Sequence, residues 1–166
     1  ALRQLGVDAQ LVTVPGHEAV NALCKLDQYI DVIIPRGGEG LVRAVTEAAT
    51  MPVLKHFKGV CHAYIEPDAD LEKALDIVFN GKVQRPGVCN ALECLLVHSH
   101  VAGEFLPKVA AKLGGAGVEF RACPASLPLL GATAVAQQPD DLGQEFHALV
   151  LAVCVVDSMD TALDHI

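Results

Sequence analysis

The sequence contains no tryptophan, only two tyrosines and five phenylalanines, and no long apolar run. Its longest apolar stretch, ALVLAVCVV at 148–156, has the length of a β-strand and falls short of the roughly 18–20 residues that a membrane-spanning helix needs. Basic residues are also scarce, because 12 Lys and Arg oppose 20 Asp and Glu and give a formal net charge of −8. This charge argues against a nucleic-acid surface. We therefore expect a cytoplasmic protein that binds neither membranes nor nucleic acids.

Cysteine occurs six times, but its spacing lacks the patterns of a metal site or a disulfide framework. The sequence contains neither C-x-x-C nor H-x-x-x-H. Cys61 and His62 are adjacent, and because neighbouring residues of a strand point to opposite faces, they are poor partners for one zinc ion. We expect no metal and a reducing compartment. Four cysteines lie in apolar or periodic segments, where a free thiol acts as a small hydrophobe: Cys24, Cys61, Cys94 and Cys154.

Apolar residues make up 52% of the sequence, and short β-branched runs alternate along it with helical patterns. This alternation is typical of βαβ units and predicts an α/β fold with a parallel-rich sheet and flanking helices. Helices are predicted at 17–26, 38–50, about 68–80, 101–113 and 124–130, with another beginning at the end of the chain. Strands are predicted at 9–14, 31–35, 51–54, 59–66, 93–99, 118–123, 132–137 and 148–156.

A break in the alternation near 55–59 separates two α/β blocks, because lysines, a histidine and a glycine interrupt the pattern there. We place a boundary at this point, with 1–57 and 58–166 as the two parts. The sequence opens at Ala1 without a methionine, and DSMDTALDHI at its end reads as a helix that stops in mid-course. We interpret the sequence as a piece of a longer protein.

The stretch QRPGVCNALE, 84–93, places Cys89 in a polar, turn-forming context. Pro86 lacks a backbone N–H and Gly87 permits unusual dihedral angles, so the chain is expected to bend just before the thiol. If the backbone N–H groups of Cys89 and Asn90 point into a cleft, they lower the thiol pKa and hold a developing oxyanion, as a covalent cysteine enzyme requires. The residue types alone also fit an ordinary loop cysteine between a helix and a strand.

A second stretch, IDVIIPRGGEGLV at 30–42, runs from a predicted strand through Arg36, Gly37 and Gly38 into a predicted helix. Glycines at such a turn let a ligand approach the backbone, and the helix start favours anionic groups. The pattern differs from G-x-G-x-x-G, so taken alone it also fits a tight strand-to-helix turn.

Taken together, these stretches resemble a known family. The segments IPRGG, KGVCHAYIEPDADLEKA and QRPGVCNALECLLV are similar to those of the γ-glutamyl phosphate reductases, or glutamate-5-semialdehyde dehydrogenases, the proline-pathway branch of the aldehyde dehydrogenase superfamily. The resemblance covers nearly the whole chain and is most specific at the cysteine block. It implies that 1–57 is the end of a dinucleotide-binding lobe and that 58–166 is an incomplete catalytic lobe.

The resemblance implies NADPH-dependent reduction of L-glutamyl 5-phosphate to L-glutamate 5-semialdehyde, with release of phosphate through a cysteine thioester, in an enzyme that is a homo-oligomer. Cys89 matches the catalytic thiol of the family. Asn90 matches a residue that helps to position the acyl oxygen. Glu93 belongs to the same motif, where it could orient the loop.

Cofactor residues are implied in the same way. Arg36, Gly37 and Gly38 match the turn that borders the nicotinamide end of the cofactor, and Glu145 matches a glutamate on the nicotinamide ribose. The first βαβ units of the family, which carry most cofactor contacts, have no counterpart in the sequence. We therefore expect this chain alone to bind NADPH weakly or not at all.

Two features depart from the family pattern. Gly87 stands where many relatives carry serine or threonine, which could change the stiffness of the loop. The hydrolytic aldehyde dehydrogenases carry a glutamate in an L-E-L-G-G-K block that activates water, whereas the corresponding region here reads LKHFKGV, with His56 but no glutamate. The absence fits a thioester that must be reduced and not hydrolysed.

Two other interpretations stay open. The chain could be a folded binding or assembly fragment without turnover, or a cysteine hydrolase that pairs Cys89 with a histidine. His62, His98 and His100 are candidate bases, and the last two are expected to share one face of a strand. Packing or solvent-facing roles are more common for such histidines.

Overall fold

The computed structural model describes residues 9–55 and 58–166. The chain divides into two compact units, 1–57 and 58–166, which are treated separately below. The boundary between them falls within the predicted break at 55–59. Among the described residues, no helix combines the length and the apolar character needed to cross a bilayer.

The first unit contains the helices α1, His17–Leu23, and α2, Glu39–Ala48. The predicted strands at 31–35 and 51–54 meet only in one isolated parallel bridge between Ile33 and Val53. The strand predicted at 9–14 does not form, and Leu11 in this segment is 87% exposed. A β-branched run becomes a strand only when a neighbour pairs with its backbone, and the described part of this unit offers segment 9–14 no such neighbour.

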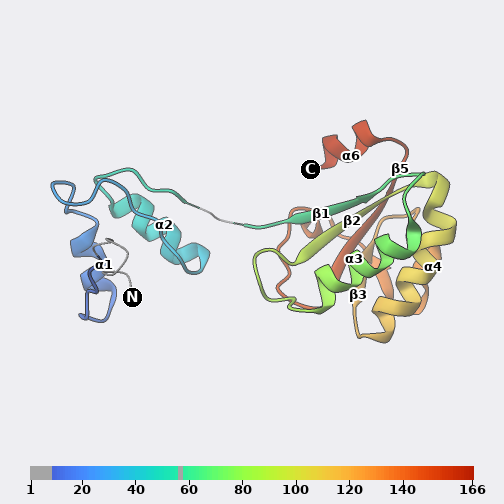
Figure 1. Ribbon diagram of the computed structural model, residues 1–166, viewed down its shortest axis with the longest axis horizontal. Coiled ribbons are helices and arrows are strands. Elements are labelled where there is room, and N and C mark those ends of the chain that lie inside the picture. Colours follow the sequence, from blue (N-terminus) through green and yellow to red (C-terminus); the bar gives the residue numbers. More distant parts are fainter. Residues whose placement is uncertain (1–8, 56–57) are drawn as a thin grey trace. The chain divides into compact units, whose positions relative to one another are not determined.

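The second unit is built on a five-stranded sheet in the order β1-β2-β5-β3-β4, in which every pair of neighbours is parallel (Figure 1). The strands follow the predicted pattern within two or three residues at each end. Their bounds are β1 Cys61–Ile65, β2 Leu92–His98, β3 Glu119–Ala122, β4 Ala134–Ala136 and β5 Val150–Val156. The parallel α/β prediction is confirmed.

Helices cover both faces of this sheet. One face carries the main core, in which α3, α4 and α5 contribute apolar side chains beside those of the strands. The other face carries a smaller cluster that includes Cys94, Cys154 and Ala162 of α6. The helices are α3 Leu71–Val83, α4 Ser99–Gly115, α5 Leu127–Leu130 and α6 Met159–His165, with short 3₁₀ turns at Gly131–Thr133 and Pro139–Asp141.

Local chemistry explains where several elements lie. All seven residues of β2 are buried, as expected for a central strand that is covered on both faces. Helix α3 begins where the sequence places three acidic residues, and the Asp70 side chain accepts hydrogen bonds from the backbone N–H groups of Glu72 and Lys73. Helix α4 ends at Gly115, the predicted stop.

Candidate active site around Cys89

Cys89 lies between α3 and β2 at the centre of the second of two consecutive turns. The N–H of Val88 donates to the Arg85 carbonyl at 3.4 Å, so that Pro86 and Gly87 form the first turn. The N–H of Ala91 then donates to the Val88 carbonyl at 3.0 Å, which places Cys89 and Asn90 at the corner of the second. The bend predicted before the thiol is present.

The corner position leaves the thiol and its backbone accessible. Cys89 is exposed, whereas Cys24, Cys94 and Cys154 are buried and Cys61 and Cys123 are half-buried. Within the described part of the chain, the backbone N–H groups of Cys89 and Asn90 donate no hydrogen bond. Two unengaged N–H groups beside an exposed thiol are the arrangement that an oxyanion site requires.

Gly59 holds the other side of this loop by close backbone approach. A Cβ atom at Gly59 would lie 2.2 Å from the carbonyl oxygen of Cys89, so no larger residue fits without a shift of backbone. The same carbonyl faces the Cys61 thiol, with Sγ 3.7 Å from the oxygen. The start of β1 therefore sets the position of the Cys89 peptide. This role of Gly59 is not visible in the sequence.

Glu145 lies close to the same glycine. The Cβ position at Gly59 is 3.4 Å from Glu145 Oε1, which brings Glu145 to the side of the site formed by Gly59 and Cys89. The Glu145 side chain is only 9% exposed; its Oε2 pairs with His147 Nε2 at 3.4 Å, and its buried Oε1 has no hydrogen-bond partner among the described residues. His147 has a left-handed backbone with φ of 53°, an uncommon conformation for a residue other than glycine. The pairing of His147 with Glu145 was missed from the sequence.

A buried ion pair joins the two ends of the thiol loop. Lys82 in the last turn of α3 donates to Glu93 Oε2 of β2 at 2.7 Å, and both side chains are fully buried. The second oxygen of Glu93 has no hydrogen-bond partner in the described structure. Glu93 therefore connects α3 to β2, the two elements that flank the thiol loop. The sequence did not predict that Lys82 is its partner. Removal of one partner of such a pair leaves an uncompensated charge in the core.

The predicted cofactor turn lies in the first unit. Gly38 is the N-cap of α2, and Arg36, Gly37 and Gly38 are all exposed. Gly37 has a φ of 158°, which residues with a side chain rarely adopt, so glycine is favoured at the helix start. The turn therefore presents backbone to solvent in front of α2, as the sequence predicted.

The histidines considered as bases for the thiol lie elsewhere. His98 is the last residue of β2, and its Nδ1 accepts from the backbone N–H of His100 in α4 at 3.2 Å. The seven-residue strand β2 spans about 20 Å, and Cys89 precedes its other end. The prediction that His98 and His100 share a strand face is therefore wrong, because the helix starts at Ser99. His56 lies outside the described residues.

The pairing of β1 with β2 shifts register between Cys61 and His62, so the simple alternation expected for these two residues is interrupted. His62 meets Cys94 and His165 of α6, a cluster that the sequence did not reveal. Burial raises the pKa of the Cys94 thiol to about 12. Burial and, to a lesser degree, the neighbouring His62 lower the pKa of His165.

A second pair of thiols lies on β5 and just after β3. The neighbouring Cys154 thiol, aided by Ser126 and the N–H of Val155, lowers the pKa of Cys123, and the proximity of the two thiols together with burial raises the pKa of Cys154. The thiol of Cys154 also donates to Gln137 Oε1 at 3.2 Å. Cys123 is thus the thiol outside the loop that competes best with Cys89 for an electrophile.

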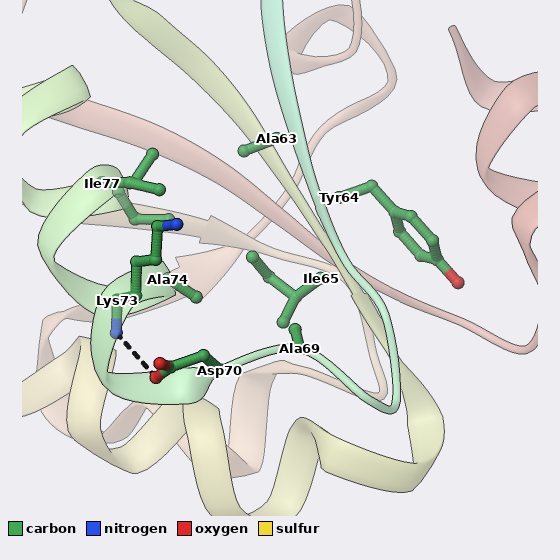
Figure 2. Close-up of a pocket in the computed structure, with 9 residues that line it drawn as sticks. Ala63, Tyr64, Ile65, Ala69, Asp70, Lys73, Ala74 and Ile77 are labelled. Carbon is green, nitrogen blue, oxygen red and sulfur yellow. Dashed lines mark hydrogen bonds between the residues drawn. The ribbon is translucent and has the colours of Figure 1, made fainter.

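Two cavities of the second unit differ in character. A polar cavity of about 380 Å³ borders the loop and is lined by residues from both of its ends, among them Arg85, Val88 and Asn90. A more apolar cavity of about 370 Å³ lies between β1, at the edge of the sheet, and α3, and its lining includes Asp70 and Lys73, which are joined by the capping bond from Lys73 N–H to Asp70 (Figure 2). Cys89 lines neither of these two cavities.

Comparison with known proteins identifies the family. Residues 1–120 match the family model of the aldehyde dehydrogenase family. The chain belongs to the aldehyde dehydrogenase family. The expected resemblance and the expected fold are therefore confirmed. Glu145 lies outside the matched segment, so its role toward a cofactor stays a prediction.

The most similar curated relatives carry one name. The chain is 82% identical over 162 residues to the γ-glutamyl phosphate reductase of Desulfovibrio desulfuricans, with 95% of this chain and 38% of the relative covered. It is 60% identical over 169 residues to that of Nitratidesulfovibrio vulgaris, with 100% and 40% covered. The chain thus spans about two fifths of the length of these relatives.

A solved structure gives the same result for the fold. The crystal structure of γ-glutamyl phosphate reductase from Thermotoga maritima superposes with a TM-score of 0.84 at 40% identity, and the match covers 90% of this chain and 36% of that one. A lactaldehyde dehydrogenase structure, at 15% identity and a TM-score of 0.67, shares the fold.

The exposure of the six thiols predicts an order of alkylation. Brief iodoacetamide treatment of the folded chain is expected to modify Cys89 first and Cys123 second, with Cys24, Cys94 and Cys154 protected by burial. Peptide mass spectrometry at short reaction times measures the order. Labelling of Cys24 or Cys154 before Cys89 would show that the loop does not present its thiol.

Proposed function

We propose that this chain supplies the reacting cysteine and part of the cofactor site of an NADPH-dependent reductase that converts L-glutamyl 5-phosphate to L-glutamate 5-semialdehyde in proline biosynthesis. The observation that carries the proposal is the exposed Cys89 at a turn corner, with the unengaged N–H groups of Cys89 and Asn90 beside it. The names of the relatives supply the substrate class, since they are called γ-glutamyl phosphate reductases.

The chemistry follows from the thiol and its surroundings. The Cys89 thiolate attacks the acyl carbon of the substrate, a C–S bond forms, and the bond between this carbon and the phosphate oxygen breaks as phosphate leaves. The backbone N–H groups of Cys89 and Asn90 stabilise the negative charge that develops on the acyl oxygen. The Asn90 side chain orients the acyl group. Gly59 keeps the Cys89 peptide in place, since only glycine permits its close approach.

The residues present fit a nicotinamide cofactor. When bound, it would supply a hydride to the acyl carbon of the Cys89 thioester, and cleavage of the C–S bond would then release the aldehyde and restore the Cys89 thiolate. Glu145 is suited to accept a hydrogen bond from a ribose hydroxyl, because its buried Oε1 lacks a partner among the described residues. Arg36, Gly37 and Gly38 offer exposed backbone at the start of α2, which suits the nicotinamide end of the cofactor.

The proposed enzyme acts in the cytoplasm as a homo-oligomer on a small-molecule substrate. We assign 1–57 to the end of the cofactor lobe and 58–166 to the catalytic lobe, since the chain divides into two compact units at this point. The hydrolase alternative finds less support, because His62 lies in a cluster with Cys94 and His165 and His98 lies at the far end of β2 from Cys89.

A chimera tests the proposal, because the chain covers about two fifths of its relatives. We would replace the matching segment of the Desulfovibrio desulfuricans reductase by this chain and assay NADPH oxidation with glutamyl 5-phosphate generated in the reaction. The chimera is expected to be active, and Cys89→Ser is expected to lower kcat/KM by at least about 10⁴-fold, since loss of a catalytic nucleophile removes the covalent path.

The control is His100→Gln, which changes an exposed residue of α4 at the other end of β2. It is expected to leave activity within about threefold, as for a surface substitution away from the site. A folded chimera without activity, or one in which Cys89→Ser keeps most of its activity, would overturn the proposal.

A further inference from the structure

Three potential metal ligands from different parts of the chain meet on the α6 side of the sheet. His62 of β1 and Cys94 of β2 are register partners on neighbouring strands. His165 lies in the last turn of α6, which packs on the same face through Ala162. One ligand atom from each of the three lies within 4.8 Å of the other two. The proposed reductase chemistry uses none of them.

The separation of Cys94 and His165 matches that of two ligands in a tetrahedral site. Cys94 Sγ lies 3.5 Å from His165 Nε2. With Zn–S and Zn–N bonds of about 2.3 and 2.0–2.1 Å, a tetrahedral angle places sulfur and nitrogen about 3.5 Å apart. The rings of His62 and His165 meet edge to face with centroids 5.6 Å apart, so their nitrogens can converge on one ion by small side-chain rotations.

A hydrogen bond to the backbone of Val60 prepares His62 for this role. Its Nδ1 lies 2.8 Å from the Val60 carbonyl oxygen, which can only accept a hydrogen bond. The proton is therefore on Nδ1, and Nε2 keeps a free lone pair. Metal-bound histidines typically donate their other ring N–H to a carbonyl or carboxylate in this way.

The ligand types select the metal. One thiolate and two imidazoles suit Zn²⁺, which takes three protein ligands and leaves a fourth position for water. Cys94 is buried, while His62 and His165 are half-buried, so the open position faces the solvent side of the cluster. Sequence spacing could not show the cluster, since its members are 32 and 71 residues apart.

We propose that His62, Cys94 and His165 bind one Zn²⁺ in a tetrahedral site with one position open to solvent, and that this ion holds α6 against β1 and β2. The competing explanation is a simple hydrogen bond between the Cys94 thiol and His165. The site is independent of the reductase proposal, because its binding test needs no turnover.

The test uses the 166-residue chain after treatment with chelator and reductant. Titration with Co²⁺ is expected to produce the intense visible bands of a tetrahedral ion together with a thiolate-to-metal charge-transfer band, and one equivalent of Zn²⁺ is expected to remove both. Cys94→Ala should abolish the charge-transfer band. His165→Gln should weaken metal binding by at least about 10- to 100-fold, because changes to residues that only hydrogen-bond a metal ligand already lower metal affinity by that much.

Zn²⁺ at about 100 times its Kd should raise the unfolding midpoint by on the order of 10 °C.

Two variants serve as controls. Cys89→Ser removes the exposed thiol and His100→Gln an exposed histidine, and both should bind Co²⁺ like the unaltered chain. The proposal is overturned if no charge-transfer band appears, or if the band survives in Cys94→Ala and disappears in Cys89→Ser. Circular dichroism checks folding; if Cys94→Ala does not fold, unchanged affinity in His165→Gln would equally overturn it.

Discussion

Replacement of Glu93 by alanine is expected to lower the free energy of unfolding of the 58–166 unit by about 3–5 kcal/mol. Glu93 and Lys82 are both fully buried and 2.7 Å apart, so the variant leaves the Lys82 ammonium group in the core without its counter-charge. The loss is a large share of the roughly 5–15 kcal/mol that keeps a domain folded. Urea denaturation of the chain, followed by circular dichroism, measures it.

A double variant separates the penalty for an unpaired charge from the value of the pair. Lys82→Met combined with Glu93→Leu fills the same space with apolar groups and leaves no buried charge, so it is expected to recover most of the lost stability. A single variant that loses less than about 1 kcal/mol would show that water reaches Lys82. A double variant no more stable than the single one would show that the pair itself stabilises the fold.

Local patterns were sufficient to predict most elements of the second unit. The run at β2 is apolar enough to be central, and acidic residues mark the start of α3, where Asp70 forms the cap. The bend before Cys89 follows from Pro86, whose fixed φ suits the first corner position of a turn, whereas Gly87 beside it does not use a positive φ. Such features depend on residues that are close together in the sequence, so they can be predicted from a single sequence.

Pairings over long distances could not be predicted in this way. The sequence does not show that β5 lies between β2 and β3, or that segment 9–14 has no strand partner among the described residues. The partners of Glu93 and Cys94 are hidden for the same reason, since Lys82 lies on a helix and His165 lies near the other end of the chain. Such contacts depend on the tertiary fold.

At Gly59, too, one tertiary contact determines which residue is allowed. Gly59→Ala is expected to lower the free energy of unfolding by about 1–3 kcal/mol, because the new Cβ would lie 2.2 Å from the Cys89 carbonyl oxygen and backbone must move to relieve the overlap. The movement displaces the thiol loop. In the reductase chimera kcat is expected to fall by about 10²-fold, the cost of a displacement near 1 Å at a reacting group.

The matched control is Gly87→Ala, the same chemical change in the same loop. A Cβ at Gly87 would approach only the His147 carbonyl oxygen, at an ordinary 3.8 Å, and Gly87 is not among the glycines with positive φ. This variant is expected to keep or raise the free energy of unfolding, by up to about 1 kcal/mol, since alanine restricts the unfolded chain. Urea denaturation of both variants gives the comparison. If both variants were equally stable, the backbone at Gly59 would shift at no cost in free energy. The Cys89 peptide would then have to be positioned by the Lys82–Glu93 pair and by the turn at Pro86 and Gly87.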